Sequence, residues 1–133
     1  PEPVVASYTA KRGAATASDL GYARQAALFD HVATLRGEPP PVIDGARFLV
    51  DPEGQLRTLC TRLDVPFDPA MLAWPAGRRE SDGVWGAHWY DAVERSTGFG
   101  APRAPGNATL EADGRRVAGT CRPYYDALLR HAL

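Results

Sequence analysis

The sequence predicts a mostly helical chain of the α/β class, in which one short strand joins a sheet. Apolar residues recur at three- and four-residue steps through much of the chain, as they do in amphipathic helices. Val42-Ile43-Asp44 differs, because three prolines precede it and Gly45 follows it, and we interpret it as a short buried strand. An isolated strand needs partners, so we expect this one to belong to a larger sheet.

The chain begins with a predicted helix that ends near Gly13. Pro1 and Glu2 suit the first turn of a helix, where a missing N–H costs nothing and the positive end of the dipole favours an acid. An apolar stripe follows, made of Val4, Val5 and Tyr8. Ser7 and Lys11 share one face, where a hydroxyl and an ammonium could contact a phosphate. The alternative is an ordinary amphipathic helix on which both side chains are solvated.

A second helix is predicted between Ser18-Asp19, which can cap its start, and Gly37, which can end it. Its apolar side is made of Leu20, Ala23, Ala27, His31 and Leu35. We interpret His31 as a histidine packed at the edge of the core rather than as a catalyst, because no nucleophile or metal-ligand pattern lies near it in the sequence.

The clearest helix signal in the chain begins at Asp51-Pro52-Glu53, which supplies an N-cap, a first-turn proline and a first-turn acid. Leucine and cysteine then recur at helical spacing up to Leu63, and Asp64-Val65-Pro66 ends the pattern. Asp68-Pro69 opens a further short turn. From the residues alone, we interpret this segment as structural.

Residues 74–90 are the second place where chemistry is expected. Arg78 and Arg79 lie in a loop rich in glycine, serine and aspartate, and two guanidinium groups offer forked donors that suit a phosphate. The alternative is a solvated arginine pair beside Glu80 and Asp82, with Trp85 and Trp89 in the core. We expect His88 to lie on a helix surface. Beyond a linker at 101–106, residues 110–133 are predicted to be mostly helical.

The composition limits the function classes. A chain of 133 residues allows one domain, and a net charge of −1 argues against a general nucleic-acid binder. No apolar run approaches the ~18 residues of a membrane span, so no membrane partner is expected. Cys60 and Cys121 show no metal-ligand spacing, so we expect no metal, and a reduced cytoplasmic setting.

Three segments resemble a known family. Residues 1–8 resemble the second half of the Arg-Asp/Asn-Pro-x-x-Val-x-x-Ser segment of sulfotransferases that use 3′-phosphoadenosine-5′-phosphosulfate (PAPS). Residues 51–72 resemble, in order and spacing, a region of many bacterial sulfotransferases. The loop at Arg78 resembles the family's Arg-Lys-Gly…Gly-Asp-Trp-Lys loop, although Val84 stands where the family has its Asp and Gly86 where it has its Lys.

The resemblance implies a fold and an activity. Residues 1–133 would be the C-terminal, mostly helical portion of one P-loop-type three-layer α/β domain, contributing one strand to its parallel sheet. The N-terminal half with the phosphate loop would be absent, so a missing half or a complementary chain is an expected partner. The parent enzyme would transfer a sulfuryl group from PAPS to a small-molecule acceptor with a hydroxyl or amine, releasing adenosine 3′,5′-bisphosphate.

The resemblance also implies site residues. Ser7 and one or both of Arg78 and Arg79 would bind the 3′-phosphate of the donor, whereas no catalytic residue can be carried over. The piece alone is expected to be inactive. The alternative function is a non-catalytic, sulfotransferase-like module for nucleotide binding or interaction. Ser7 and Arg78 favour the enzyme, whereas Val84 and Gly86 favour the module.

Overall fold

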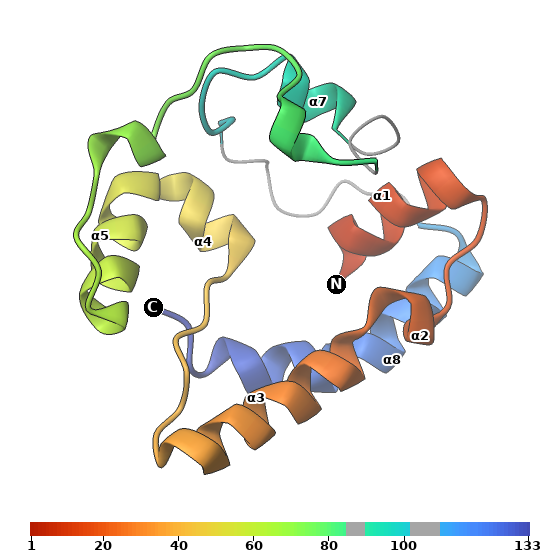
Figure 1. Cartoon of the computed structure of the whole chain (residues 1–133). Coiled ribbons are helices and arrows are strands. Elements are labelled where there is room, and N and C mark those ends of the chain that lie inside the picture. Colours follow the sequence, from red (N-terminus) through yellow and green to blue (C-terminus); the bar gives the residue numbers. More distant parts are fainter. Residues whose placement is uncertain (85–89, 102–109) are drawn as a thin grey trace. The chain divides into compact units, whose positions relative to one another are not determined.

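A computed structural model describes residues 1–84, 90–101 and 110–133 (Figure 1). The chain divides into two compact units. Unit 1 comprises Pro1–Asp44 and Ala104–Leu133, and unit 2 comprises Gly45–Arg103.

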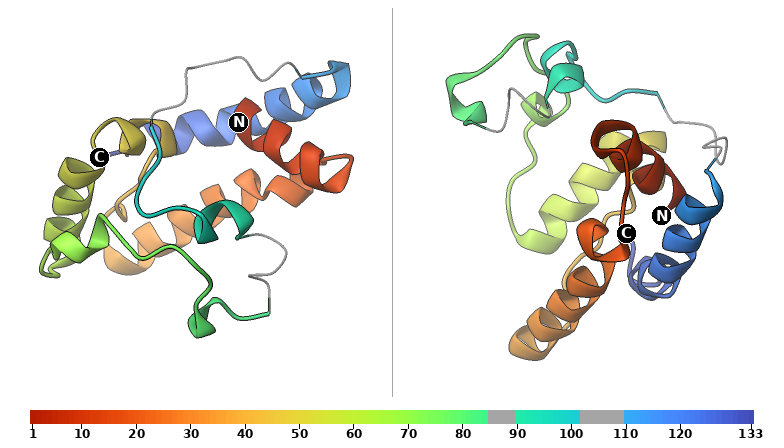
Figure 2. Two further views of the ribbon diagram at one scale, coloured as in Figure 1. Left: turned by 90° about the horizontal axis from the view of Figure 1, so that it is seen from above. Right: turned by 90° about the vertical axis from the view of Figure 1, so that its right-hand side faces the viewer.

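Unit 1 is built around its C-terminal helix α8 (Ala112–Leu129), which contacts the three other helices of the unit. These are α1 (Glu2–Arg12), α2 (Ala17–Leu20) and α3 (Tyr22–Arg36). Figures 1 and 2 show α8, in blue, beside α3, in orange. Val5, Leu110 and Ala118 form a buried cluster between α1 and the start of α8. The predicted helix at 110–133 is therefore confirmed, and it is the element on which unit 1 is assembled.

The predicted second helix is instead two helices. Thr16, rather than Ser18, caps α2 through a capping box, in which Asp19 N–H donates to the Thr16 hydroxyl and Thr16 N–H donates to the Asp19 carboxylate. Gly21 then adopts a left-handed conformation, with φ 70°, and separates α2 from α3. Gly37 ends α3 in the same conformation, as predicted.

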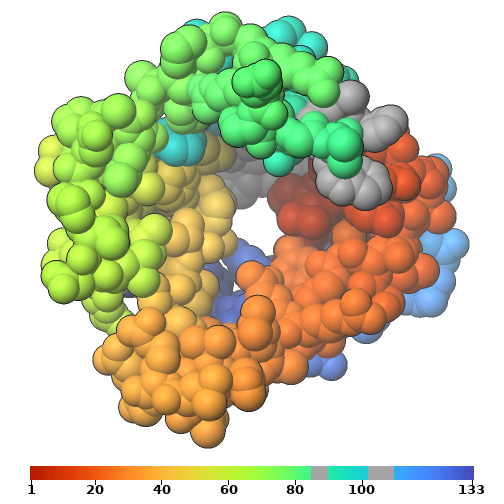
Figure 3. Space-filling model, viewed as in Figure 1, coloured from red at the N-terminus to blue at the C-terminus, as the bar shows by residue number. Residues whose placement is uncertain are grey.

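The α3 surface keeps large apolar side chains exposed. Leu28 is 60% exposed and Leu35 is 73% exposed. In Figure 3 the orange atoms of this part of the chain form part of the surface that faces the viewer. The predicted apolar side of this helix is thus only partly buried, and His31, which was expected at the edge of the core, is exposed.

Unit 2 contains short helices. They are α4 (Gly45–Val50), α5 (Pro52–Leu63), the 3₁₀ turns η1 (Pro69–Met71) and η2 (Glu80–Asp82), and α7 (Asp91–Glu94). The predicted helix after Asp51 is confirmed as α5, because the Asp51 carboxylate accepts a hydrogen bond from Gly54 N–H at 3.0 Å. Asp64 ends it with φ 54°. Buried Cys60 lies against Met71, with 3.9 Å between the two sulfur atoms.

The prediction of an α/β fold with a parallel sheet is wrong. In residues 1–84, 90–101 and 110–133 the structure contains helices and turns but no strand. Val42 forms only an isolated parallel bridge with Ala132, and its carbonyl accepts a hydrogen bond from Leu133 N–H at 3.0 Å. The prolines at 39–41 carry no N–H to extend the pairing backwards, and α4 begins at Gly45, so the pairing stops at one residue.

Candidate functional site

Ser7 lies on the solvent side of α1. The helix buries Val5 completely, and Ser7 follows two residues later. Two residues correspond to about 200° of rotation about a helix axis, so the two side chains lie on opposite faces. Ser7 is exposed accordingly, and its hydroxyl is accessible to a ligand.

Arg78 and Arg79 lie in unit 2, between η1 and η2, and both are exposed. Their backbone is held on both sides. Gly77 N–H donates to the Glu94 carbonyl at 2.7 Å, and Arg79 N–H donates to the Asp82 carboxylate at 2.8 Å. The φ angle of Gly77 is 116°, a backbone conformation that suits glycine. The two side chains thus project from a fixed segment of backbone.

A second set of contacts holds the beginning of the same segment. The Trp74 indole N–H donates to the Ser96 hydroxyl at 2.9 Å, and Trp74 N–H donates to the Thr97 carbonyl at 3.1 Å. The Trp74 ring also meets the Phe99 ring edge-on, with 5.2 Å between centroids. Ala73 pairs with Gly98 in an antiparallel bridge. The start of the arginine loop is therefore anchored to residues 94–99 of unit 2.

The charge of the two arginines is not neutralised by an ion pair within the described ranges. The carboxylate of Asp82, a predicted neighbour, instead accepts a hydrogen bond from the backbone of Arg79. Arg57, on α5 of the same unit, is paired with Glu53 at 2.7 Å. Arg78 and Arg79, which are consecutive in the sequence and both exposed, are the feature of unit 2 best suited to an anion.

The structure thus places the consecutive residues Arg78 and Arg79 in unit 2 and Ser7 in unit 1. The predictions for Trp85, His88, Trp89 and the linker at 102–106 concern positions outside the described residues. Val84, which stands where the resemblance has an aspartate, is 82% exposed.

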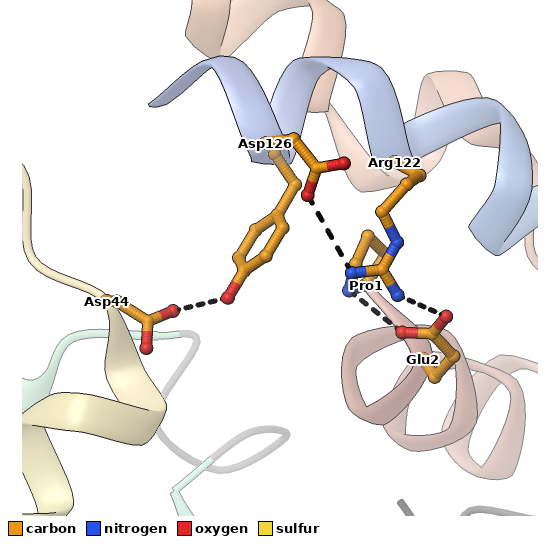
Figure 4. Close-up of polar contacts among 6 residues, drawn as sticks. Pro1, Glu2, Asp44, Arg122 and Asp126 are labelled. Carbon is orange, nitrogen blue, oxygen red and sulfur yellow. Dashed lines mark hydrogen bonds and ion pairs between the residues drawn. The ribbon is translucent and has the colours of Figure 1, made fainter. Parts of the chain in front are cut away.

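Sequence reasoning missed a polar network in unit 1 (Figure 4). Arg122 of α8 forms an ion pair with Glu2 of α1 and lies 3.9 Å from the Asp126 carboxylate. The Tyr125 hydroxyl donates to the Asp44 carboxylate at 2.7 Å. Arg122 also lies over the Tyr125 ring, 5.6 Å from its centroid. The network links both ends of Pro1–Asp44 to α8.

The network shifts the protonation of its members. The pKa of Glu2 is lowered to about 2, mainly by a hydrogen bond to its own backbone N–H and further by Arg122, so the carboxylate stays ionised. The pKa of Tyr125 is raised to about 12 by the hydrogen bond to Asp44 and by burial. Tyr125 therefore acts as a hydrogen-bond donor at neutral pH, and it is unsuited to act as a base.

In the described ranges, no group of three or more His, Cys, Asp or Glu side chains has the placement of metal ligands. None of the helices in those ranges combines the length and the hydropathy that crossing a membrane requires.

The sulfotransferase domain family matches residues 1–132 of this chain. Two curated relatives from Arabidopsis thaliana, branched-chain-amino-acid aminotransferase-like proteins 2 and 1, are 38% and 41% identical to it over 85 residues. The similarity covers 64% of this chain but 15% of the length of each relative. No solved structure matches the chain.

Proposed function

Because the chain belongs to the sulfotransferase domain family, we propose that it takes part in sulfuryl transfer from PAPS to a hydroxyl or amine acceptor. The observation that carries the proposal is the exposed pair Arg78 and Arg79, which the loop backbone holds in place without an ion pair in the described ranges. Forked guanidinium donors match a phosphate. Ser7 adds an exposed hydroxyl on α1. These three residues would bind the 3′-phosphate of the donor.

The proposed role is to bind and orient the nucleotide. In sulfuryl transfer the acceptor oxygen or nitrogen attacks sulfur, the bond from sulfur to the bridging oxygen breaks, and adenosine 3′,5′-bisphosphate leaves. Holding the nucleotide in place lowers the entropic cost of this in-line displacement. Ser7, Arg78 and Arg79 would act on the 3′-phosphate, away from the sulfur, so none of them is assigned a catalytic step.

The proposal includes a partner. We infer that residues 1–133 act as the C-terminal portion of one sulfotransferase-like domain. The phosphate loop that binds the 5′-phosphosulfate would then come from a preceding segment or a complementary chain. The sequence supports this inference, because it carries no glycine-rich phosphate loop.

A second candidate function is nucleotide binding without catalysis. It is favoured by Val84, an exposed apolar residue at the position where the resemblance has an aspartate, and by Gly86, where it has a lysine. A transfer assay of the complete parent protein with labelled PAPS and a panel of phenols and amines separates the two functions. Labelled product supports the enzyme, whereas binding of the nucleotide without product supports the module.

The test of the proposed phosphate contacts compares two nucleotides. Removing a charged hydrogen bond to the 3′-phosphate costs ~1.5–3 kcal/mol, which is about a tenfold to hundredfold loss of affinity. In titration calorimetry on the complete parent protein, Ser7→Ala and Arg78→Ala should each weaken the binding of adenosine 3′,5′-bisphosphate by this factor. Adenosine 5′-phosphate lacks the 3′ group and should bind as before.

Arg62→Ala is the matched control, because Arg62 is an exposed arginine of α5 in the same unit as Arg78. It should leave both affinities unchanged. Equal losses for the two nucleotides in the Ser7 and Arg78 variants would contradict the assignment, since they would show an effect through folding. If Arg79→Ala weakens the bisphosphate and Arg78→Ala does not, the site is retained and the phosphate contact is assigned to Arg79 in place of Arg78.

A further inference from the structure

Among the contacts between α8 and α1, the helix that carries Ser7, two involve Glu2 and Val5. Glu2, in the first turn of α1, forms an ion pair with Arg122. Val5, one turn later, is fully buried against Leu110 and Ala118. One contact is electrostatic and the other is apolar, and they meet α8 at positions four residues apart, Ala118 and Arg122.

The spacing of these two points fixes the rotation of α1. Glu2 and Val5 are three residues apart, which leaves them about 60° from each other around the helix axis, on one face. Val5 and its neighbour Ala6 pack on the buried cluster through short apolar side chains, which carry no directional hydrogen bond. The ion pair at Glu2 adds a second, directional contact, and Ser7 lies on the opposite face, about 200° from Val5.

The Arg122 side chain is itself held in place. Asp126, one turn along α8, lies 3.9 Å from the guanidinium, and the Tyr125 ring lies beneath it at 5.6 Å. Tyr125 is fixed in turn by its 2.7 Å hydrogen bond to Asp44 (Figure 4). The partner of Glu2 therefore has a defined direction rather than the freedom of an exposed arginine.

We propose that Arg122 is a positioning residue for the nucleotide site: by pairing with Glu2 it sets the rotation of α1 and so directs the Ser7 hydroxyl toward the 3′-phosphate. This inference rests on the proposed role of Ser7. Arg122 itself would not touch the nucleotide, and its effect would pass through α1. Substituting Arg122 should therefore weaken the binding of the 3′-phosphate and leave the binding of the rest of the nucleotide unchanged.

A neighbouring ion pair provides the control. Arg116 of α8 pairs with Asp113 at 3.0 Å, but both residues belong to the same helix and both are largely exposed. Removing this charge changes α8 without altering any link to α1. Arg116→Met and Arg122→Met therefore make the same chemical change on the same helix. Only Arg122→Met should affect the position of Ser7, because of these two arginines only Arg122 forms an ion pair with a residue of α1.

The experiment is a double-mutant cycle of Arg122→Met with Ser7→Ala in the complete parent protein. Titration calorimetry measures the binding of adenosine 3′,5′-bisphosphate and of adenosine 5′-phosphate. We expect Arg122→Met to weaken the binding of the bisphosphate by about fivefold, because a half-exposed ion pair can contribute a factor of this size. The affinity for adenosine 5′-phosphate should not change. In the Ser7→Ala background the same substitution should have no further effect. Arg122→Lys keeps the charge but loses the planar fork and the stacking on Tyr125, so it should restore only part of the affinity that Arg122→Met loses.

Each outcome separates the two proposals. If Ser7→Ala has no selective effect on the bisphosphate, the proposed phosphate contact fails. If Ser7→Ala is selective but Arg122→Met weakens both nucleotides equally, or weakens the bisphosphate equally in both backgrounds, Arg122 has only a structural role and this inference is overturned. Glu2→Gln removes the same ion pair from the other side and provides the measurement if Arg122→Met does not fold.

Discussion

Tyr125 makes the stability of the protein depend on pH in the alkaline range. Its pKa is raised from 10.0 to about 12, first by the hydrogen bond to Asp44 and then by burial. A group with a raised pKa stabilises the fold below its unfolded-state pKa and loses that contribution as the pH rises through its folded-state pKa. We therefore expect the free energy of unfolding to fall between pH 10 and about 12.

Urea unfolding of Tyr125→Phe tests this expectation. The variant should be less stable than the wild type by about 1 kcal/mol at pH 7, and the difference should shrink toward pH 12. Tyr124→Phe is the matched control, because Tyr124 is an exposed tyrosine on the same helix. A constant difference between wild type and Tyr125→Phe across this range would contradict the assignment of the hydrogen bond.

Features of single residues could be predicted from the sequence where they depend only on neighbouring residues. The exposure of Ser7 follows from its place opposite Val5 on a helix, and the Asp51 cap follows from a motif of three residues. The pairing of Glu2 with Arg122 joins positions 120 apart in the sequence, so no local pattern contains it. Its visible signals were only an acid in the first turn of one helix and an arginine on another.

The Asp51 cap at the N-terminus of α5 leaves no room for a side chain at Gly54. Gly54 N–H donates to the Asp51 carboxylate, and a Cβ at Gly54 would lie 2.1 Å from the Asp51 Oδ2 atom. Alanine at Gly54 should gain about 1 kcal/mol of helix propensity but displace a cap that contributes about 1 kcal/mol. Gly54→Ala should therefore be nearly neutral in the wild type and stabilising by about 1 kcal/mol in the Asp51→Ala background.

Thermal unfolding of the four proteins in this cycle measures the coupling between the two sites. Gly119→Ala serves as the reference, because a Cβ at this position of α8 meets open space. Gly119→Ala should raise the stability of the wild type and of the Asp51→Ala variant by similar amounts. If Gly54→Ala stabilises both backgrounds equally, the cap either does not form or tolerates the added methyl group.

At the scale of elements, prediction succeeded where the determinants were local and failed where they were not. The helices α5 and α8 carry their own caps or periodicity, and both form as predicted. A strand needs a partner, which residues 42–44 alone cannot supply, and the only pairing of Val42 that the structure describes is one bridge to Ala132. The break at Gly21 was missed because the apolar pattern continues across it.

The described part of the chain buries little apolar surface. Among the described residues, the buried hydrophobic side chains are Val5, Cys60, Leu110, Ala118, Cys121 and Leu128, and unit 2 contributes only Cys60. Large apolar side chains remain exposed in both units, including Leu35 and Val50 at 73% and 72%. Burial of apolar surface is the main driving force that offsets the conformational entropy lost on folding.

We therefore predict that residues 1–133 made alone are poorly stable. Calorimetry should give a broad transition of low enthalpy, well below the ~0.7 kcal/mol per residue of ordinary globular proteins. A dye specific for exposed apolar surface should bind at room temperature. Leu35→Glu should reduce dye binding without lowering the melting temperature, whereas Leu128→Ala, in the core, should destabilise by ~2–5 kcal/mol. A sharp, cooperative melt of a monomer, with masses checked by light scattering, would contradict this prediction, because it would require a core that these side chains do not provide.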